Sequence, residues 1–403
     1  MPKQTRAFHI VDLIRHASRS AGFLVAAAVL VAPAVAAQSL EQRITQQIDT
    51  PPFNHQLWGI ALVDASGRLL YGRNEERPFI PASNTKLVVS AVASALLPPD
   101  WTVKTSLYAD GPVVDGVLEG DLVLYGRGDP TFSRRCYSVD TTVAGSCDDN
   151  PLDGMAQLAG KLRAAGIRTV AGDIVGDGSY FGPELVHPAW EVYDLNWWYA
   201  APVTALGFND NSLDISWDPG RTPGAPAEIS FIPDFGNVVM VNRTRTVESG
   251  GRTTIDFFRD PGTLTVRAVG NVPLDSDGRT EYLALPDPNH FAAAALRQVL
   301  ADSGISVLGR TGSTTDSTRY DHLRRQPALA ELESRPLKDW IFPVLNTSQN
   351  WFAEMLLKQL GRQFGEAGTW DEGLEVERRF LIDSVGIDST QFSLSDGSGL
   401  SST

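Results

Sequence analysis

The chain has 403 residues, of which 42% are hydrophobic and 20% are charged. This length suggests about two or three domains, and the composition is sufficient for substantial hydrophobic cores. The formal net charge of −14 argues against nucleic acid and against an anionic membrane surface as partners, because both repel an acidic protein.

The first 36 residues predict a secretory signal peptide. An apolar run at 21–33 is too short to span a bilayer as a helix, and Ala34-Val35-Ala36 after it is a small-x-small cleavage signal. The run follows a basic region that contains Lys3, Arg6, Arg15 and Arg19. We expect a mature protein that is exported, periplasmic and without a transmembrane anchor. The alternative is that the segment stays attached as an uncleaved anchor.

The next segment predicts two strands and a helix. Residues 57–63 and 68–71 have strand character and are joined by Asp64-Ala65-Ser66-Gly67, which has the composition of a turn. Pro81 suits the entry to a helix, and the run at 87–97 is apolar nearly all round, which is typical of a buried helix. The pair Pro98-Pro99 ends it.

The start of this helix carries a Ser-x-x-Lys pattern, Ser83-Asn84-Thr85-Lys86. On a helix, side chains three residues apart share one face, so Ser83 and Lys86 can touch. A hydroxyl is a weak nucleophile until a base takes its proton, and a buried lysine of lowered pKa can be that base. The helix N-terminus would favour an oxyanion at the serine. The alternative is a capping serine beside a lysine that only extends its charge to the surface.

The only two cysteines, Cys136 and Cys147, lie in a polar loop with ten residues between them. In an oxidising compartment such a pair predicts a local disulfide, with free thiols as the alternative. No histidine lies nearby and the six histidines are scattered. The sequence therefore predicts neither a metal site nor a cofactor.

The rest of the chain mixes strands and helices. Residues 213–285 contain short strands separated by Pro, Gly and Asp turns, which predicts an all-β segment. Within the helix at 351–360, Glu354 and Lys358 are four residues apart and are expected to pair on the exposed side. Further strands are predicted at 103–109, 118–125, 170–177 and 305–308, and further helices at 155–165, at 291–301, within 329–341 and at 374–385.

A second pattern precedes the helix at 351–360. Ser348-Gln349-Asn350 is a Ser-x-Asn, in which the Ser348 hydroxyl could relay a proton to a leaving group and the Asn350 amide could hold Lys86 and a substrate carbonyl. When this pattern is considered alone, the alternative is that it forms a plain helix N-cap.

Ser-x-x-Lys followed by Ser-x-Asn occurs in penicillin-binding proteins and serine β-lactamases. Here the second pattern begins 262 positions after Lys86, which is far too long for a simple β-lactamase. The chain resembles the D-alanyl-D-alanine carboxypeptidases with a large insert, the type-4 class C penicillin-binding proteins. Further stretches that resemble this family are 120–124 with 128–131, 172–177, 201–206 and Asp396-Gly397-Ser398-Gly399-Leu400-Ser401.

The resemblance implies an α/β (α+β) fold in which a transpeptidase-like domain is split by inserted β-rich domains. The expected division is residues 37–97 with 287–403 for the catalytic domain and 98–286 for the inserted region. Ser83 would be acylated by the penultimate D-Ala of a peptidoglycan stem peptide, D-Ala would leave, and water would hydrolyse the acyl-enzyme. The family also cuts D-Ala–diaminopimelate cross-links and is acylated by β-lactams. Its motifs carry onto Ser83, Lys86, Ser348 and Asn350, and Gln349 departs from the commoner Asp.

A third family motif, Lys-Thr-Gly on a strand, would follow the stretch 396–401, about sixty to a hundred residues further on if the analogy holds. We therefore expect a truncated enzyme that lacks one oxyanion donor, a loss that typically lowers rates by about 10²–10³. Arg310-Thr311-Gly312-Ser313 resembles the motif but precedes Ser348. Alternative hypotheses are a non-catalytic exported cell-wall-binding protein with the same fold, or an unrelated exported β-rich protein.

Overall fold

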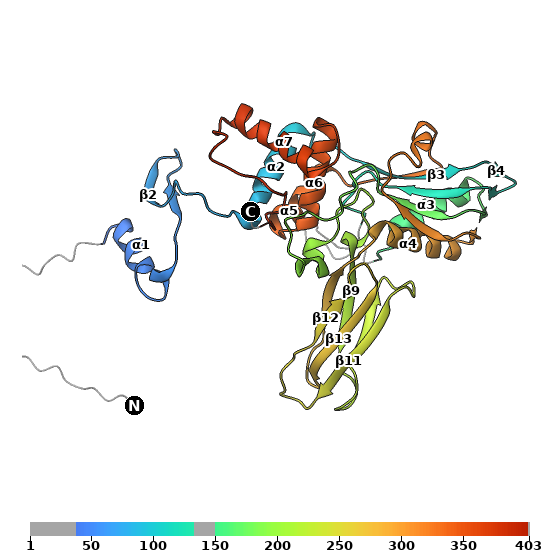
Figure 1. Ribbon diagram of the computed structural model, residues 1–403, viewed down its shortest axis with the longest axis horizontal. Helices are drawn as coiled ribbons and strands as arrows, with labels where there is room; N and C mark the ends of the chain where they lie inside the picture. Colours follow the sequence, from blue (N-terminus) through green and yellow to red (C-terminus); the bar gives the residue numbers. More distant parts are fainter. Residues whose placement is uncertain (1–37, 133–149, 402–403) are drawn as a thin grey trace, which may run out of the picture. The chain divides into compact units, whose positions relative to one another are not determined.

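A computed structural model describes residues 38–132 and 150–401 (Figure 1). It divides into two compact units, one that ends at Arg77 and one that begins at Pro78. Two predictions lie outside the described residues: the signal peptide at 1–36 and the disulfide between Cys136 and Cys147.

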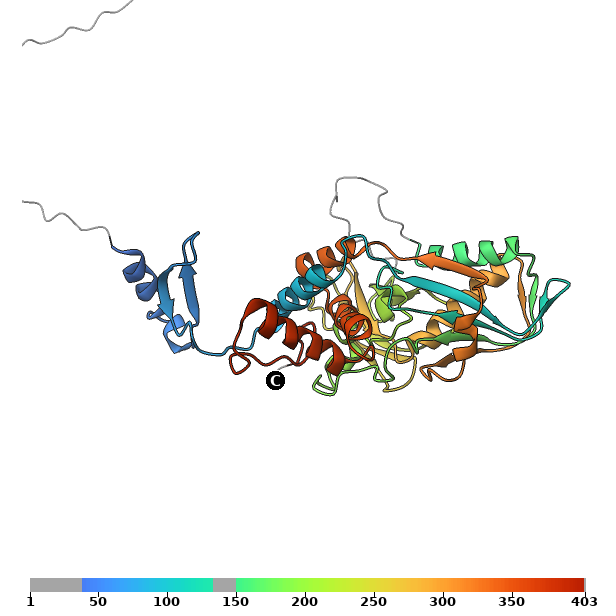
Figure 2. The ribbon, with the colours of Figure 1, turned by 90° about the horizontal axis from the view of Figure 1, so that it is seen from above.

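The first unit is a helix with a hairpin, drawn in blue in Figure 2. Helix α1 spans Leu40–Ile48, and strands β1 (Ile60–Val63) and β2 (Leu69–Arg73) pair antiparallel. The Asp64 carboxylate closes the turn by accepting bonds from the backbone N–H groups of Ser66 and Arg68, at 2.9 and 3.0 Å. The predicted pair of strands joined by 64–67 is therefore confirmed.

The second unit contains a mixed five-stranded sheet in the order β16-β8-β6-β3-β17. Strand β8 is parallel to both β16 and β6, whereas β3 is antiparallel to both β6 and β17. A second sheet runs in the order β15-β7-β5-β4. The strands of the first sheet are β3 (Lys104–Asp110), β6 (Asp121–Tyr125), β8 (Ile174–Asp177), β16 (Thr311–Thr314) and β17 (Ala330–Glu333), and those of the second are β4 (Val113–Val114), β5 (Val117–Leu118), β7 (Thr169–Val170) and β15 (Ser306–Val307).

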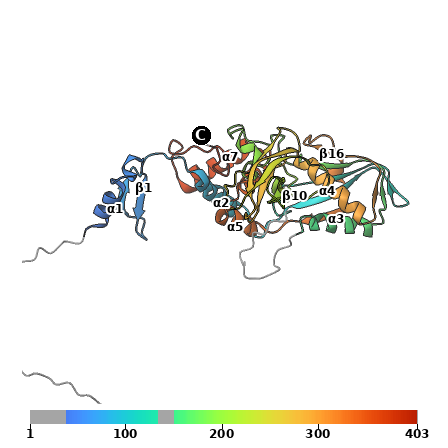
Figure 3. The same ribbon diagram turned by 90° about the horizontal axis from the view of Figure 1, so that it is seen from below.

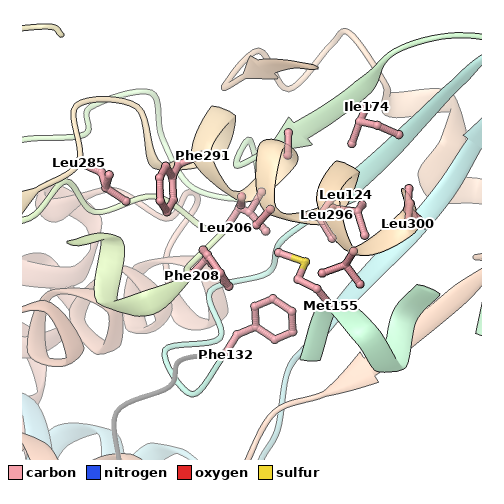
Figure 4. Close-up of a cluster of buried hydrophobic side chains, with 14 of the residues drawn as sticks. Leu124, Phe132, Met155, Ile174, Leu206, Phe208, Leu285, Phe291, Leu296 and Leu300 are labelled. Atoms are coloured by element: carbon pink, nitrogen blue, oxygen red, sulfur yellow. The ribbon is translucent and has the colours of Figure 1, made fainter. Parts of the chain in front are cut away.

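Helices α3 (Asp153–Ala164) and α4 (Pro288–Asp302) supply apolar side chains to the core beside these sheets. In Figure 4, Met155 of α3 and Leu296 and Leu300 of α4 belong to the same buried cluster as Leu124 of β6, and Phe291 of α4 lies at the end of the cluster near Phe208. The expected domain boundary at 287 stays a prediction, but β15, β16 and β17 lie after that residue and pair with strands that lie before it. This pairing favours grouping 288–333 with the inserted region.

Residues 212–284 form two further three-stranded sheets, in agreement with the predicted all-β segment. Strand β9 lies between β10 and β14, and β13 lies between β11 and β12. Their cores contain Trp217 and Phe257. The strands are β9 (Ser212–Asp218), β10 (Glu228–Ile232), β11 (Val239–Val247), β12 (Asp256–Arg259), β13 (Thr265–Pro273) and β14 (Arg279–Ala284).

Four helices form the remaining part of the second unit: α2 (Thr85–Leu96), α5 (Leu337–Asn346), α6 (Asn350–Phe364) and α7 (Trp370–Phe380). Helix α2 contacts the other three, and Figures 1 and 3 show it beside α5 and α7. Helix α6 is buried on every side from Trp351 to Gly361. Helix α2 is buried on one face only, with Leu87 exposed, so the prediction of a helix buried all round is wrong.

The described residues also contain short 3₁₀ turns at Phe53–His55, Ala82–Asn84, Asp194–Asn196, Trp198–Ala200, Asn209–Asn211 and Asp321–Arg325. A π-helical turn at Leu381–Val385 follows α7. The mixed α/β fold class is as predicted. Within residues 38–132 and 150–401, no helix combines the length and the apolar character that crossing a membrane requires.

Candidate active site

The Ser83 hydroxyl lies at the N-terminal end of α2. The 3₁₀ turn Ala82–Asn84 runs directly into that helix, and Ser83 is exposed. Lys86, one turn later, is only 1% exposed. Its Nζ lies 3.2 Å from Ser83 Oγ, within hydrogen-bond distance, so the helical spacing brings the two groups into contact as expected.

The Lys86 ammonium is held from two distant parts of the chain. Besides Ser83 Oγ, its Nζ donates to Asn350 Oδ1 at 2.7 Å and to the backbone carbonyl of Ser398 at 2.8 Å. Burial lowers the pKa of Lys86 to about 8, while the negative charges of Glu354 and Asp396 oppose this shift. An amine with this pKa is neutral in roughly a tenth of molecules at pH 7, which is enough for it to accept a proton from Ser83.

Asn350 is the first residue of α6, and its side chain is fixed at both ends. Its Nδ2 donates to the backbone carbonyl of Tyr199 at 2.9 Å, which leaves Oδ1 to accept from Lys86. Ser348 lies two residues before it, partly exposed, with a positive φ of 57°. Among the hydrogen bonds of the described residues, none joins Ser348 to Ser83 or Lys86. The structure therefore brings Asn350 into contact with Lys86 and leaves a role for Ser348 as a prediction.

Gln349, between these two residues, is buried and anchors the start of α6. Its Oε1 accepts from the backbone N–H of Trp351 at 3.1 Å, and its Nε2 donates to Asp210 Oδ2 at 3.0 Å. The sequence predicts no role for this residue, because the middle position of the family motif is not expected to take part in the chemistry.

Glu354 and Lys358 are both 0% exposed. The predicted surface pair is therefore wrong: each side chain bonds to a different distant loop. Lys358 Nζ donates to the backbone carbonyls of Glu184 and Val203 at 2.6 and 3.2 Å and lies 3.7 Å from the centre of the Trp370 ring. Burial lowers the pKa of Lys358 to about 7.

Glu354 accepts three hydrogen bonds. They come from the backbone N–H groups of Gly397 and Ser398, at 3.0 and 2.8 Å, and from the Trp370 indole at 2.8 Å. Burial raises the pKa of Glu354 to about 7, and the nearby charge of Asp396 adds to the effect. One sequence signal could have revealed this residue: an acid within the mainly apolar run 351–360.

The candidate substitute for the third motif, 310–313, lies elsewhere in the second unit. Residues 311–313 lie in β16, an edge strand of the five-stranded sheet. The Thr311 hydroxyl lies 2.9 Å from His290 Nε2, and the Ser313 hydroxyl donates to Asp287 at 2.7 Å. These contacts place the strand beside α4. In the part of the chain that the structure describes, no group of three or more His, Cys, Asp or Glu is arranged to hold a metal ion.

Residues 40–403 match the family described as the D-Ala-D-Ala carboxypeptidase 3 (S13) family. A D-alanyl-D-alanine carboxypeptidase of Actinomadura sp. is 30% identical over 370 residues, which are 90% of this chain and 64% of that protein. The D-alanyl-D-alanine carboxypeptidase DacB of Haemophilus influenzae is 23% identical over 330 residues, covering 80% of this chain and 63% of the relative.

Among solved structures, penicillin binding protein 4 of Haemophilus influenzae has a TM-score of 0.69 at 21% identity, over 84% of this chain and 69% of that one. This likeness shows a shared fold. The chain spans a little under two thirds of the length of the two carboxypeptidases above. The resemblance drawn from the motifs is confirmed: the chain belongs to the D-Ala-D-Ala carboxypeptidase 3 (S13) family.

Proposed function

We propose that the protein is a serine peptidase that removes the terminal D-Ala from peptidoglycan stem peptides through an acyl-enzyme on Ser83. One observation carries this proposal: a buried Lys86 amine of lowered pKa lies 3.2 Å from an exposed Ser83 hydroxyl at a helix start. Family membership supports the substrate class. Cutting of D-Ala–diaminopimelate cross-links, acylation by β-lactams and an exported, periplasmic location belong to the same proposal.

In the first step, neutral Lys86 takes the Ser83 proton while Oγ attacks the carbonyl carbon of the penultimate D-Ala. The resulting oxyanion benefits from the positive end of the helix, because Ser83 lies at its N-terminus. The bond to the terminal D-Ala then breaks, and its amine leaves with a proton that Ser348 is proposed to relay. Water then attacks the ester carbonyl and gives one proton to Lys86, which passes it to Ser83 Oγ as the acyl group leaves as a carboxylic acid. Asn350 would keep the lysine aligned throughout.

Mapping of a covalent adduct tests the proposal. The protein is incubated with fluorescent penicillin and digested, and the labelled peptide is sequenced by mass spectrometry. We expect a single adduct on the Ser83 hydroxyl, together with release of D-Ala from a D-Ala-D-Ala peptide. Labelling at another residue, or no labelling under conditions that label the related carboxypeptidases, would overturn the assignment.

The acylation rate should depend on pH. Lys86 acts as the base only when neutral, and its pKa is about 8. The neutral fraction rises about tenfold per pH unit below the pKa. We therefore expect the rate constant for penicillin acylation to rise between pH 6 and 8 and to level off above about pH 8.5. Stopped-flow fluorescence across this range measures it, and a rate that stays flat from pH 6 to 8 would exclude Lys86 as the base.

A further inference from the structure

Asn350 and Glu354 lie on one face of α6, because residues four apart in a helix point the same way. Asn350 contacts Lys86 directly, at 2.7 Å. Glu354 reaches the same lysine through one intervening residue, Ser398. A single helix therefore presents two polar side chains toward the amine.

Ser398 connects the carboxylate to the amine through its backbone. Its N–H donates to Glu354 Oε1 at 2.8 Å, and its own carbonyl accepts from Lys86 Nζ at 2.8 Å. The neighbouring N–H of Gly397 donates to the other oxygen of Glu354, at 3.0 Å. Two consecutive backbone donors thus hold the chain directly before the Ser398 carbonyl, which is the third acceptor of Lys86.

Hydrogen bonds to Asp396 tie the loop at 396–401 together. Asp396 accepts from the backbone N–H groups of Gly399 and Ser401, at 2.6 and 2.7 Å, and from the Trp190 indole at 3.0 Å. These bonds set the shape of the loop. Its position against α6 depends on Glu354, because the two bonds from 397 and 398 cross from the loop to the helix.

Other charged groups surround the carboxylate. Lys358 follows on α6, Asp396 belongs to the loop, and Glu377 extends from α7. His187 packs against Trp370, with ring centres 5.3 Å apart. Glu377 is also 0% exposed, yet neither of its oxygens has a hydrogen-bond partner among the described residues, and burial raises its pKa well above the usual range. Glu377 thus offers a matched acid that does not bond to the loop.

We propose that Glu354 is a positioning residue that holds the Ser398 carbonyl against Lys86 and thereby keeps the amine in line with Ser83. The proposal rests on the proposed function for its kinetic consequence but not for its structural one. Glu354 has two effects on Lys86. Its hydrogen bonds position the Ser398 carbonyl that accepts from the amine, and its negative charge favours the ammonium form of Lys86.

Two substitutions separate these effects. Glu354→Gln keeps the size but removes the charge and one acceptor, so the pKa of Lys86 should fall by about one unit. The pH profile of acylation should then move to lower pH, and its plateau should fall about tenfold because the lysine is misplaced. Glu354→Asp keeps the charge but shortens the side chain by one methylene, so the plateau should fall with a smaller shift in pH.

The pKa is measured directly by NMR with ¹³Cε-labelled lysine, in which Lys86→Arg assigns the signal. Glu377→Gln is the matched control and should leave both the Lys86 titration and the acylation plateau unchanged. Thermal unfolding identifies variants that remain folded. If folded Glu354→Gln and Glu354→Asp both retain the titration and the rate of the parent protein, the proposal is wrong. If the parent is not acylated at all, the proposed function fails, and the lysine titration still decides whether Glu354 controls Lys86.

Discussion

Replacing Lys86 by methionine should lower the rate constant for penicillin acylation of Ser83 by about 10³-fold. Methionine preserves the unbranched, buried stem but cannot take a proton, and loss of a positioned general base typically costs about 10²–10⁴ in rate. The amine lies 3.2 Å from Ser83 Oγ, and no other side-chain nitrogen bonds to that hydroxyl among the described residues. Stopped-flow fluorescence with a labelled penicillin measures the rate.

Lys358→Met is the matched control for this substitution. Lys358 is equally buried and also has a lowered pKa, but it bonds to the backbone of 184 and 203 and makes no contact with Ser83. We expect this variant to be acylated at a rate within a few fold of the parent, provided that thermal unfolding shows it to be folded. Equal losses in the two folded variants would mean that Lys86 acts through packing and not as a base.

Replacing Gly399 by alanine should reduce the same rate constant by about 10²-fold. Gly399 has a φ of +74°, and a Cβ added to it would lie 1.8 Å from the backbone oxygen of Ala82 and 2.8 Å from the Thr85 hydroxyl. These two residues flank Ser83 at the start of α2, so the clash must move the nucleophile, the loop or both. A displacement of about 1 Å can cost about 10²-fold in rate.

Gly386→Ala separates the clash from the cost of the backbone conformation. Gly386 has a similar φ of +82°, but no atom lies within 4 Å of the added Cβ. Both variants adopt left-handed backbone, which costs about 1–2 kcal/mol for a residue with a side chain. Gly386→Ala should therefore lose stability in thermal unfolding and keep its acylation rate. A comparable loss of rate in both variants would contradict a steric effect specific to Gly399.

The contact between Ser83 and Lys86 could be predicted because it depends only on helical spacing. Asn350 comes from 264 positions further along the chain, and its contact with Lys86 follows from the family motifs rather than from any local pattern. Glu354 could not be placed in this way. Glu354 lies four residues before Lys358, and an acid and a base at this spacing on a helix are typical of a surface ion pair. Two of the three donors to Glu354, Gly397 and Ser398, belong to a loop that no local pattern connects to α6.

The sheets show the same limit on a larger scale. The all-β segment at 213–285 could be recognised because its short strands and turns are local features. Strands β16 and β17 were not predicted, and their partners lie far away in the chain: β16 pairs with β8, and β17 pairs with β3 from more than 200 positions earlier. Non-local pairing of this kind is set by tertiary packing rather than by strand character. The boundary expected at 287 came from the resemblance to the family, and no local pattern in the sequence could test it against this pairing.

Two of the groups that hold the lysine and its asparagine partner are main-chain oxygens, those of Ser398 and Tyr199. Such an oxygen is present whatever side chain the residue carries. Relatives can therefore differ in sequence at 398 and 199 and still provide the same two acceptors, as long as the path of the backbone is kept. Sites of this kind are best compared by superposing carbonyl positions, because residue identities alone would overlook them.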